Sequence, residues 1–529
     1  MMNTSAFEVL GPIMVGPSSS HTAGALRIAL VARLLGPKPL VHVEFKLYNS
    51  FAHTYKGHGS DKALVAGILG LAPDDIRVRN SFELAKKQGL RFEFSPQDNG
   101  AGKHPNTVCI CMEGLDGQTM SVTGESLGGG RMRISSIDNI DVEISGDYPT
   151  LFVAHQDTPG VLAALTNILS LHSINIATMR TFRSKRGGKA YTVFEVDDAL
   201  PGELLSTLKK IDHVYLVNTV NIPGACGVNP ETEMIYGFDT GEQLLRLCTT
   251  HHMSIGEVMR ARELAFGATK NVDEQMLHVL EVMREEVTDP ILHPRKSLGG
   301  LLGGQAKLVA TAPERLTHAL MGETLTKSVA YAMAVLERSA TMGVIVAAPT
   351  AGSAGIVPGA LLGLAEAIDA SDEEITKALW NSCAIGALLA HNASVAGAEG
   401  GCQAEVGSAA AMAASALCEL MGAGPAVSLA AASTAIANLL GLVCDPVRGL
   451  VEYPCQDRNA IGVANAISAC QLALSGVIDP LPFDEVTQAM KQVGEALPQT
   501  LRETALGGLA AAPSAKTAVS VCGACNLCD

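Results

Sequence analysis

The chain has 529 residues, 47% of them hydrophobic, which is enough to bury a sizeable core in three or four domains of roughly 100–200 residues. Its formal net charge of −15 argues against a nucleic-acid-binding surface, although a local site on an acidic protein can still attract a small anion. The thirteen cysteines, in a chain whose N-terminus lacks a secretory pattern, argue for reduced thiols and a cytoplasmic protein rather than a disulfide framework.

Residues 1–140 predict an α/β domain. Two polar clusters, GPSSSHTAG at 16–24 and YKGHGSDKALVAGILG at 55–70, look like loops rich in hydroxyl groups and histidine, each followed by a helix. The stretch 40–50 between them alternates apolar and polar residues, as a strand does.

Residues 147–222 read as strand, helix, two strands, helix and strand. A strand at 150–157 leads into a helix that Pro159 opens, and the RGG at 186–188 indicates a hairpin turn. This order predicts the ferredoxin-like α+β unit and resembles an ACT domain, a small regulatory module that usually binds amino acids. A plain structural or dimerising domain is the alternative.

The remaining chain predicts a linker at 223–234 and an all-α domain over 235–529 that is interrupted by glycine-rich loops. Two apolar stretches, 343–368 and 426–444, are either broken by proline and glycine or rich in small residues, and Glu366 is their only charged residue. We therefore expect buried helices there and no membrane partner. The fold class is multidomain, with α/β, ferredoxin-like and all-α parts in that order.

Three cysteines of the all-α domain, Cys402, Cys444 and Cys455, adjoin turn sequences that contain glycine, proline or acidic residues. Cys383, Cys418 and Cys470 lie in apolar helical runs, where thiols pack as small hydrophobic groups. The spacing of the first three, C-x41-C-x10-C, is neither that of a zinc ribbon nor that of a ferredoxin. Spacing alone therefore leaves a metal site and plain buried thiols both open.

The sequence around these cysteines is more specific. AEGGCQAEVGSA and CDPVxGLVExPCxxRNAIG are similar to the α-domain of bacterial iron–sulfur L-serine dehydratases, and the resemblance extends to SLGGLLGG (297–304), APTAGSAGIVPG (348–359) and both N-terminal clusters. It implies a carbon–oxygen lyase of the L-serine ammonia-lyase type that converts L-serine to pyruvate and ammonia. It also implies a 4Fe-4S cluster with Cys402, Cys444 and Cys455 as ligands and one open iron, an ACT-type regulatory domain, and a homodimer or higher homo-oligomer.

Elimination of water from serine faces two obstacles. The α-proton is only weakly acidic, and hydroxide is a poor leaving group, so both groups must be activated. Pyridoxal phosphate is not expected, because Lys56 is the nearest candidate lysine and no convincing phosphate loop accompanies it. The open iron of the implied cluster is a Lewis acid that activates both groups. The family pattern matches two histidines, and we assign His58 as the base and His21 as substrate-orienting residue or alternate base. A structural loop histidine is the alternative for each.

Hydroxyl and backbone groups near these motifs are the candidate substrate contacts. Together with Lys56 and Asn459 they are Ser18, Ser19, Ser20, Thr22, Thr350, Gly352 and Ser353. Glu399, Asp445 and Asn459 flank the cysteines and are expected to orient the cluster or the substrate. Gln305 and Arg448 depart from the family pattern, so the choice between serine and threonine stays open. A non-catalytic iron–sulfur sensor of amino acids is the remaining alternative.

The chain ends in VCGACNLCD, with Cys522, Cys525 and Cys528 at C-x2-C-x2-C spacing. Three interpretations stay open: an incidental tail, a second metal or redox site, or a thiol, with Cys528 the first candidate, that occupies the open iron in the absence of substrate.

Overall fold

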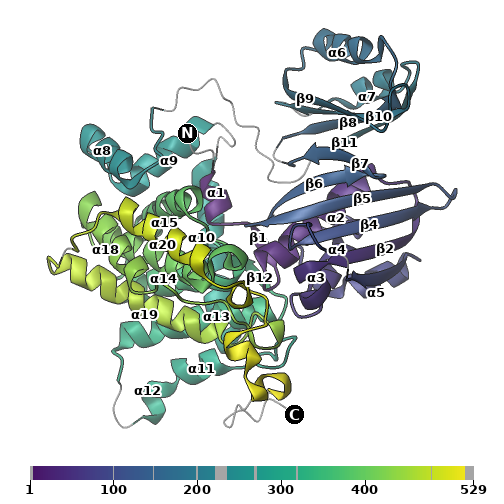
Figure 1. Ribbon diagram of the computed structural model, residues 1–529. Helices are drawn as coiled ribbons and strands as arrows, with labels where there is room; N and C mark the ends of the chain where they lie inside the picture. Colours follow the sequence, from purple (N-terminus) through teal and green to yellow (C-terminus); the bar gives the residue numbers. More distant parts are fainter. Residues whose placement is uncertain are drawn as a thin grey trace. The chain divides into compact units, whose positions relative to one another are not determined.

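Figure 1 shows the computed structural model, which describes residues 4–98, 100–146, 148–197, 200–220, 235–266, 271–316, 320–477 and 479–518. The chain divides into two units. Met1–Ser19 with Thr232–Asp529 forms the first, which we call the helical unit, and Ser20–Glu231 forms the second, the sheet unit. Each is described by itself. The predicted linker 223–234 lies outside the described residues.

The first part of the sheet unit is a six-stranded mixed sheet in the order β3-β2-β4-β5-β6-β7 (Figure 1). β2 is parallel to β3, and the other neighbouring pairs are antiparallel. Alternate residues of β2 and β4 are buried, so the sheet has one packed face and one partly open face. The strands are β2 (Leu40–Tyr48), β3 (Arg91–Gln97), β4 (Thr107–Gly114), β5 (Thr119–Gly128), β6 (Arg131–Ile137) and β7 (Ile140–Ile144).

Helices α2 (Ala25–Leu35) and α4 (Ser60–Leu69) pack on each other and follow the two polar clusters, as predicted. A Cβ at Gly67 would lie 2.4 Å from the Leu26 carbonyl oxygen, so a glycine is needed where the two helices approach. The shorter helices of this part are α3 (Asn49–Thr54) and α5 (Ser81–Lys87). The helical pair thereby fixes the positions of SSSHTAG and GHGSD relative to each other.

The second part of the sheet unit has the predicted ferredoxin-like order. Its four antiparallel strands lie in the order β11-β8-β10-β9, and the apolar sides of two helices complete its core. This confirms the α+β prediction, and the pairing of β9 with β10 agrees with the predicted hairpin turn. The elements are β8 (Thr150–Gln156), α6 (Val161–Leu171), β9 (Ile176–Arg183), β10 (Lys189–Val196), α7 (Gly202–Leu208) and β11 (Val214–Val220).

Polar contacts join the two parts of the sheet unit. Asp138, at the β6–β7 turn, accepts hydrogen bonds from Tyr191 Oη at 2.9 Å and from Lys189 Nζ at 3.0 Å. Asn218 on β11 donates to the carbonyl of Leu35, the last residue of α2, at 3.2 Å. These hydrogen bonds connect the ferredoxin-like part to the six-stranded sheet and to α2, the helix that follows the histidine cluster.

The helical unit also contains the start of the chain, which the prediction of a domain over 1–140 did not anticipate. Short helix α1 (Ala6–Val9) is held by Glu263, whose carboxylate accepts from the Ala6 N–H and from Ser5 Oγ. Strand β1 (Ile13–Val15) pairs antiparallel with β12 (Val344–Val346). The first nineteen residues thus belong with the all-α part, because their hydrogen-bond partners lie there.

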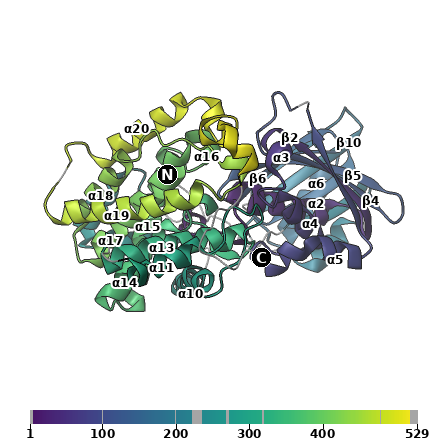
Figure 2. The same cartoon turned by 90° about the horizontal axis from the view of Figure 1, so that it is seen from below.

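Small residues allow the long helices of this unit to pack closely. Helices α13, α15, α17 and α19 lie side by side (Figure 2). A Cβ at Gly355 would lie 2.2 Å from the carbonyl oxygen of Ala332, and one at Gly363 would lie 2.0 Å from Ser328 Oγ. The helices are α8 (Gly241–His251), α9 (Ile255–Phe266), α10 (Val272–Leu292), α11 (Gln305–Ala310), α12 (Ala312–Arg315), α13 (Glu323–Ala340), α14 (Ile356–Ile368), α15 (Asp372–Asn392), α16 (Gly397–Gly400), α17 (Ser408–Leu420), α18 (Pro425–Ala437), α19 (Cys455–Leu474) and α20 (Phe483–Ala496).

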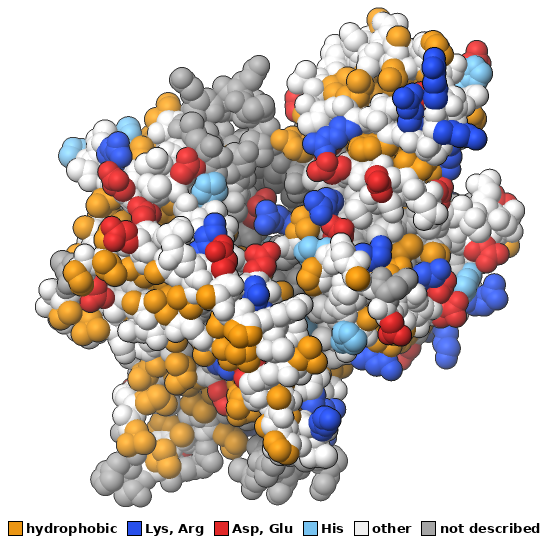
Figure 3. All heavy atoms as spheres, in the orientation of Figure 1, with side chains coloured by type: hydrophobic (Ala, Val, Ile, Leu, Met, Phe, Trp, Pro, Cys, Tyr) orange, Lys and Arg blue, Asp and Glu red, His pale blue; other side chains and the backbone are white. Residues whose placement is uncertain are grey.

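Among the described residues, a single helical stretch, Ala351–Ile368, is long and apolar enough to cross a membrane by length and composition, and 72% of it is buried within the protein. The second stretch expected to form a buried helix, 426–444, contains most of α18, which ends at Ala437. Basic and acidic side chains are interspersed on the face shown in Figure 3.

Candidate metal centre and histidine pair

Cys402, Cys444 and Cys455 converge in the helical unit, although 41 and 10 residues separate them in sequence. Cys402 precedes the π-helical turn Gln403–Gly407, Cys444 follows α18, and Cys455 is the first residue of α19. Their exposed fractions are 3%, 4% and 9%. The hydrogen bond to Cys402 raises the pKa of Cys444, and burial, followed by the Cys402 charge, raises that of Cys455. Cys383, Cys418 and Cys470 are buried in helices, as predicted.

Glu405 lies close to two of these cysteines, and the sequence did not single it out. Ligand atoms of Glu405, Cys402 and Cys444 all lie within 4.8 Å of one another. Thr350 Oγ1 donates a 2.7 Å hydrogen bond to the Glu405 carboxylate, and burial raises the pKa of Glu405. A Cβ at Gly397 would lie 2.7 Å from Glu405 Oε2 and 3.4 Å from Cys444 Sγ, so these groups fill the space that the glycine leaves. The signal in the sequence was the three-residue spacing from Cys402.

Arg458 contacts the segments of all three cysteines. Its Nη1 lies 3.4 Å from Cys402 Sγ and donates to the Val443 carbonyl at 2.8 Å, while Nη2 donates to Asp445 Oδ1 at 2.7 Å. Because Arg458 lies in the first turn of α19, it also fixes the helix that begins at Cys455. Asp445, for which the sequence predicts an orienting role, forms this ion pair, and the role itself stays a prediction. Arg458 itself was missed.

Asn459 lies one helical turn after Cys455 and is fully buried. Its Nδ2 donates to the carbonyls of Gly352 and Cys455 at 2.8 and 2.9 Å, and its Oδ1 accepts from the Gly355 N–H at 3.1 Å. It therefore connects the cysteine helix to the APTAGSAG turn. This geometry makes Asn459 a residue that positions the turn, and its predicted roles in orienting the cluster and contacting the substrate stay predictions.

The predicted anion nest at 350–353 faces a carboxylate of the protein itself. Besides the Thr350 bond to Glu405, Ser353 Oγ donates to the Ala348 carbonyl at 3.1 Å, and Gly352 approaches Glu405, since a Cβ there would lie 3.0 Å from Oε1. The hydroxyl hydrogens of Thr350 and Ser353 thus have acceptors within the protein. Because a hydroxyl group has one hydrogen to donate, these bonds use the two hydroxyl groups within the protein, and the backbone nest for an anion stays a prediction.

The SLGGLLGG motif surrounds a second buried carboxylate that the sequence did not single out. Glu452 accepts hydrogen bonds from Ser297 Oγ at 2.7 Å, from the Gly299 N–H at 2.7 Å and from the Leu301 N–H at 2.8 Å. Glu452 is three residues before Cys455. The motif therefore anchors the segment that leads into the third cysteine.

The sheet unit brings the two predicted histidines together. The ring centroids of His21 and His58 are 4.4 Å apart in an edge-to-face arrangement, and both side chains are fully buried. His21 Nε2 lies 2.9 Å from Ser50 Oγ, and its Nδ1 lies 3.0 Å from Ser20 Oγ. Burial, and then the neighbouring His58, hold the pKa of His21 well below its ordinary value, so its imidazole is neutral near pH 7.

The hydroxyl cluster differs from its prediction in two respects. Residues Ser19–Gly24 form a π-helical turn rather than a loop, because the turn continues directly into α2. Thr22 Oγ1 donates to the His58 carbonyl at 2.7 Å and so holds the backbone of His58, while its predicted contact with the substrate stays a prediction. Ser18 and Ser19 are buried. Lys56 is exposed, with Nζ 5.7 Å from the centroid of the Tyr55 ring.

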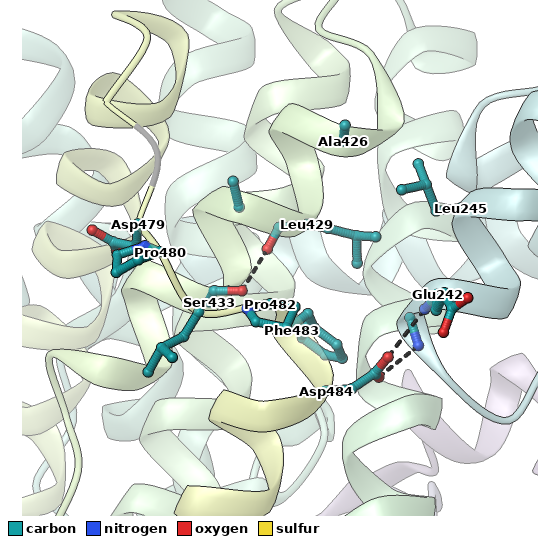
Figure 4. Close-up of a pocket in the computed structure, with 13 residues that line it drawn as sticks. Glu242, Leu245, Ala426, Leu429, Ser433, Asp479, Pro480, Pro482, Phe483 and Asp484 are labelled. Atoms are coloured by element: carbon teal, nitrogen blue, oxygen red, sulfur yellow. Dashed lines mark hydrogen bonds between the residues drawn. The ribbon is translucent and has the colours of Figure 1, made fainter.

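Two further features of the helical unit, Glu399 and an apolar cavity, have no hydrogen bond to the three cysteines among those described. Glu399 is exposed and accepts from Ser394 Oγ at 2.6 Å, which does not support its predicted orienting role. An apolar cavity of about 370 Å³ lies between α18, the start of α8 and residues 479–484 (Figure 4). Asp484 at its rim accepts from the Gly241 and Glu242 N–H groups and so caps α8. None of the predicted site residues lines this cavity.

Comparison with known proteins assigns three consecutive parts of the chain to known families. The sequence profile of the serine dehydratase alpha chain matches residues 250–510, that of the serine dehydratase beta chain matches 5–134, and that of the ACT domain matches 149–213. The chain therefore belongs to the serine dehydratase family, with both chain types and an ACT domain in one polypeptide. This confirms the resemblance on which the sequence analysis relied.

Some relatives match nearly the whole chain, and others are separate alpha or beta chains that match one part of it. An L-serine dehydratase of Streptomyces coelicolor is 31% identical over 528 residues, 96% of this chain and 99% of that protein. A probable L-serine dehydratase alpha chain of Bacillus subtilis is 43% identical over 282 residues, 53% of this chain and 93% of that protein. An L-serine dehydratase beta chain of Peptoniphilus asaccharolyticus is 42% identical over 222 residues, 42% of this chain and all of that protein.

Proposed function

We propose that the protein is an L-serine dehydratase that converts L-serine to pyruvate and ammonia. Loss of the α-proton and the β-hydroxyl group gives an enamine, which tautomerises to an imine, and hydrolysis of the imine releases the two products. The reaction is a carbon–oxygen bond cleavage, so the enzyme is a lyase. The convergence of Cys402, Cys444 and Cys455, in a chain of this family, is the observation that carries the proposal.

The three thiols fit an iron–sulfur group. They are buried, Cys402 and Cys444 lie with Glu405 in a group whose ligand atoms are within 4.8 Å of one another, and soft thiolate donors suit iron–sulfur clusters. We propose that they hold a 4Fe-4S cluster. When bound, such a cluster would supply an open iron that acts as a Lewis acid toward the carboxylate and hydroxyl oxygens of the substrate. Arg458 offsets thiolate charge beside Cys402.

The histidine pair supplies the proton chemistry in this proposal. His58 is assigned as the base that removes the α-proton, and His21 orients His58 or the substrate, or serves as the base itself. A neutral imidazole can accept a proton near pH 7, and the lowered pKa of His21 keeps that ring neutral. Thr22 holds the backbone of His58, and the remaining candidate donors to the substrate carboxylate are Ser18, Ser19 and Ser20.

The other parts of the proposal concern regulation and assembly. The ACT domain is proposed to bind an amino-acid effector and to take part in a homodimer or larger homo-oligomer in the cytoplasm. The contacts of Asp138, Lys189 and Tyr191 support a coupling of that domain to the rest of the sheet unit. Two results together would contradict the proposed regulation and assembly: sedimentation that shows a lone monomer, and a hyperbolic dependence of the rate on serine concentration.

Cys522, Cys525 and Cys528 lie outside the described residues, and the role of Cys528 at the open iron stays a proposal. Deletion of residues 522–529 should change the oxygen sensitivity and the resting spectrum of the reconstituted enzyme. Unchanged behaviour would exclude that role.

The direct test of function is product analysis with the iron-loaded protein under anaerobic conditions. L-Serine should give pyruvate and ammonia in equal amounts, and L-threonine should give 2-oxobutanoate at a lower kcat/KM. A higher kcat/KM for threonine would make the protein a threonine lyase. Iron-loaded protein that binds either amino acid without forming a keto acid would favour a sensor.

A further inference from the structure

Strand β4 of the six-stranded sheet carries a pair of cysteines that the proposed reaction does not use. Cys109 and Cys111 are two residues apart, so both point to the partly open face, while Val108 and Ile110 fill the packed face. Their sulfur atoms are 3.9 Å apart, and both side chains are half-buried. Two thiols thus lie in contact at a position that small solutes can reach.

The neighbouring strands surround this pair with polar groups. In the registers of β4 with β2 and β5, Cys109 lies between Lys46 and Thr123, and Cys111 lies between Glu44 and Ser121. Lys46 Nζ is 3.4 Å from Glu44 Oε2, which holds the ammonium group on this face.

These neighbours make one of the two thiols a nucleophile. The hydrogen bond from Cys111, with help from Thr123 and the charge of Lys46, outweighs burial and lowers the pKa of Cys109 to about 6. The same hydrogen bond raises the pKa of Cys111. A thiolate next to a thiol and a cation is the arrangement of a reactive dithiol.

We propose that Cys109 and Cys111 form a dithiol that hydrogen peroxide oxidises reversibly to a disulfide. The Cys109 thiolate attacks one peroxide oxygen, so that an S–O bond forms, the O–O bond breaks, and hydroxide leaves and takes up a proton to become water. The Cys111 sulfur then attacks the sulfenic acid; an S–S bond forms, the S–O bond breaks, and a second water leaves. The two thiols lose two electrons and two protons, and the peroxide is reduced to two water molecules.

The geometry of the strand indicates that this disulfide is labile. A rise of about 3.3 Å per residue places both the Cα and the Cβ atoms of residues two apart at about 6.6 Å, whereas the Cβ atoms of a disulfide are about 3.5–4.5 Å apart. The bond therefore closes only if β4 bends locally, and the oxidised pair is strained. Strained and accessible disulfides are the ones that thiol reductants break readily. We therefore expect a small dithiol such as dithiothreitol to restore both thiols.

A second cysteine pair provides an internal comparison. Cys418 and Cys470 have their sulfur atoms only 3.3 Å apart, but both are buried between helices of the helical unit. If proximity alone controlled oxidation, that pair would react first. In each pair the hydrogen bond from the neighbouring thiol lowers the pKa of one cysteine, Cys109 or Cys470, so access is what favours Cys109 and Cys111.

The experiment is a titration of the full-length, iron-loaded protein with hydrogen peroxide at about pH 6, followed by alkylation, trypsin and mass spectrometry. Cleavage after Lys103 and Arg131 releases residues 104–131, whose only cysteines are Cys109 and Cys111. We expect this peptide to become lighter by two hydrogen atoms and to resist alkylation, before Cys470 changes, and to recover with dithiothreitol. The readout is independent of catalytic activity and of the state of any cluster.

Variants separate the steps. Cys111→Ser should leave a sulfenic acid on Cys109 that a dimedone-type reagent traps, and Lys46→Gln should slow oxidation about threefold, whereas Lys87→Gln on α5 should not. The proposal is overturned if residues 104–131 stay a dithiol while Cys470 is oxidised, or if the oxidised product is a bond between two chains.

Discussion

Arg458 and Asp445 form a buried ion pair beside the three cysteines, with Nη2 and Oδ1 2.7 Å apart and side chains exposed by only 14% and 3%. Asp445 follows Cys444 directly, and its other carboxylate oxygen accepts from the Leu509 N–H at 2.7 Å. The pair therefore joins the end of one cysteine segment to the helix that begins with Cys455. A third contact, from Arg458 to Cys402, includes the remaining segment.

Arg458→Gln should both destabilise the helical unit and reduce its iron content. Removal of one partner from a buried ion pair leaves the other charge uncompensated, which costs about 3–5 kcal/mol. Urea unfolding and iron per chain after anaerobic reconstitution measure the two effects. Arg448→Gln is the matched control, since that exposed side chain donates only to backbone carbonyls and should change stability by about 0.5 kcal/mol or less. Equal effects of the two substitutions would contradict this account.

Thr350→Val should lower iron occupancy while the fold is retained. The valine is similar in size but leaves the partly buried Glu405 carboxylate without its 2.7 Å donor, a loss of about 1–3 kcal/mol. Thr350→Ser keeps the hydroxyl group and should behave as the parent protein. Thermal unfolding and iron analysis of the three proteins measure the effect. A serine variant as impaired as the valine variant would show that the hydrogen bond alone does not account for the loss.

The sequence predicted the fold of each part well and the contacts of the site incompletely. Periodicity was sufficient for β2 and for the whole ferredoxin-like order, because those elements follow from local patterns of apolar residues. The inclusion of residues 1–19 in the helical unit was missed, since the pairing of β1 with β12 joins strands more than 300 residues apart.

At the site, the three cysteines were predicted from a resemblance and not from their spacing. Glu405, Glu452 and Arg458 were missed because a buried charge is recognised by its partners, and those partners come from distant segments. Conversely, Thr22, Thr350 and Ser353 were assigned to the substrate, although each donates to a group of the protein itself. Sequence shows which side chains can donate a hydrogen bond, but only the fold shows where the donor is used.

Glu452→Ala should loosen the segment before Cys455. The substitution removes a carboxylate that accepts three hydrogen bonds from the SLGGLLGG motif, and hydrogen bonds to a charged group contribute about 1.5–3 kcal/mol each. We expect faster amide hydrogen exchange at Gly299 and Leu301 together with a lower unfolding temperature. Glu399→Ala, which removes an exposed carboxylate, is the control. Unchanged exchange in the Glu452 variant would refute the anchoring role.

The pKa of His21 predicts a pH dependence for the stability of the sheet unit. Because the folded-state pKa lies well below the ordinary value of 6.5, the unfolded chain binds the proton more readily. The stabilising contribution is therefore complete above pH 6.5 and is lost as the pH falls from there toward the folded-state pKa, with a slope of up to about 1.4 kcal/mol per pH unit.

Hydrogen exchange of α2 and α4 between about pH 7 and pH 5.5, corrected for intrinsic rates, measures that slope. His21→Gln should flatten it, and His53→Gln, which removes an exposed histidine from α3, should not. An equally steep slope in the His21 variant would assign the dependence to another group.

The most direct test of the central claim is anaerobic reconstitution with iron and sulfide, followed by an assay of pyruvate from L-serine, for the parent protein and for Cys402→Ala, Cys444→Ala, Cys455→Ala and Cys470→Ala. We predict that the parent and the Cys470 variant bind iron and sulfide and form pyruvate, whereas the other three variants lose both properties. Pyruvate formation without bound iron, or full iron binding in the three variants, would contradict the proposed ligand set and the mechanism that depends on it.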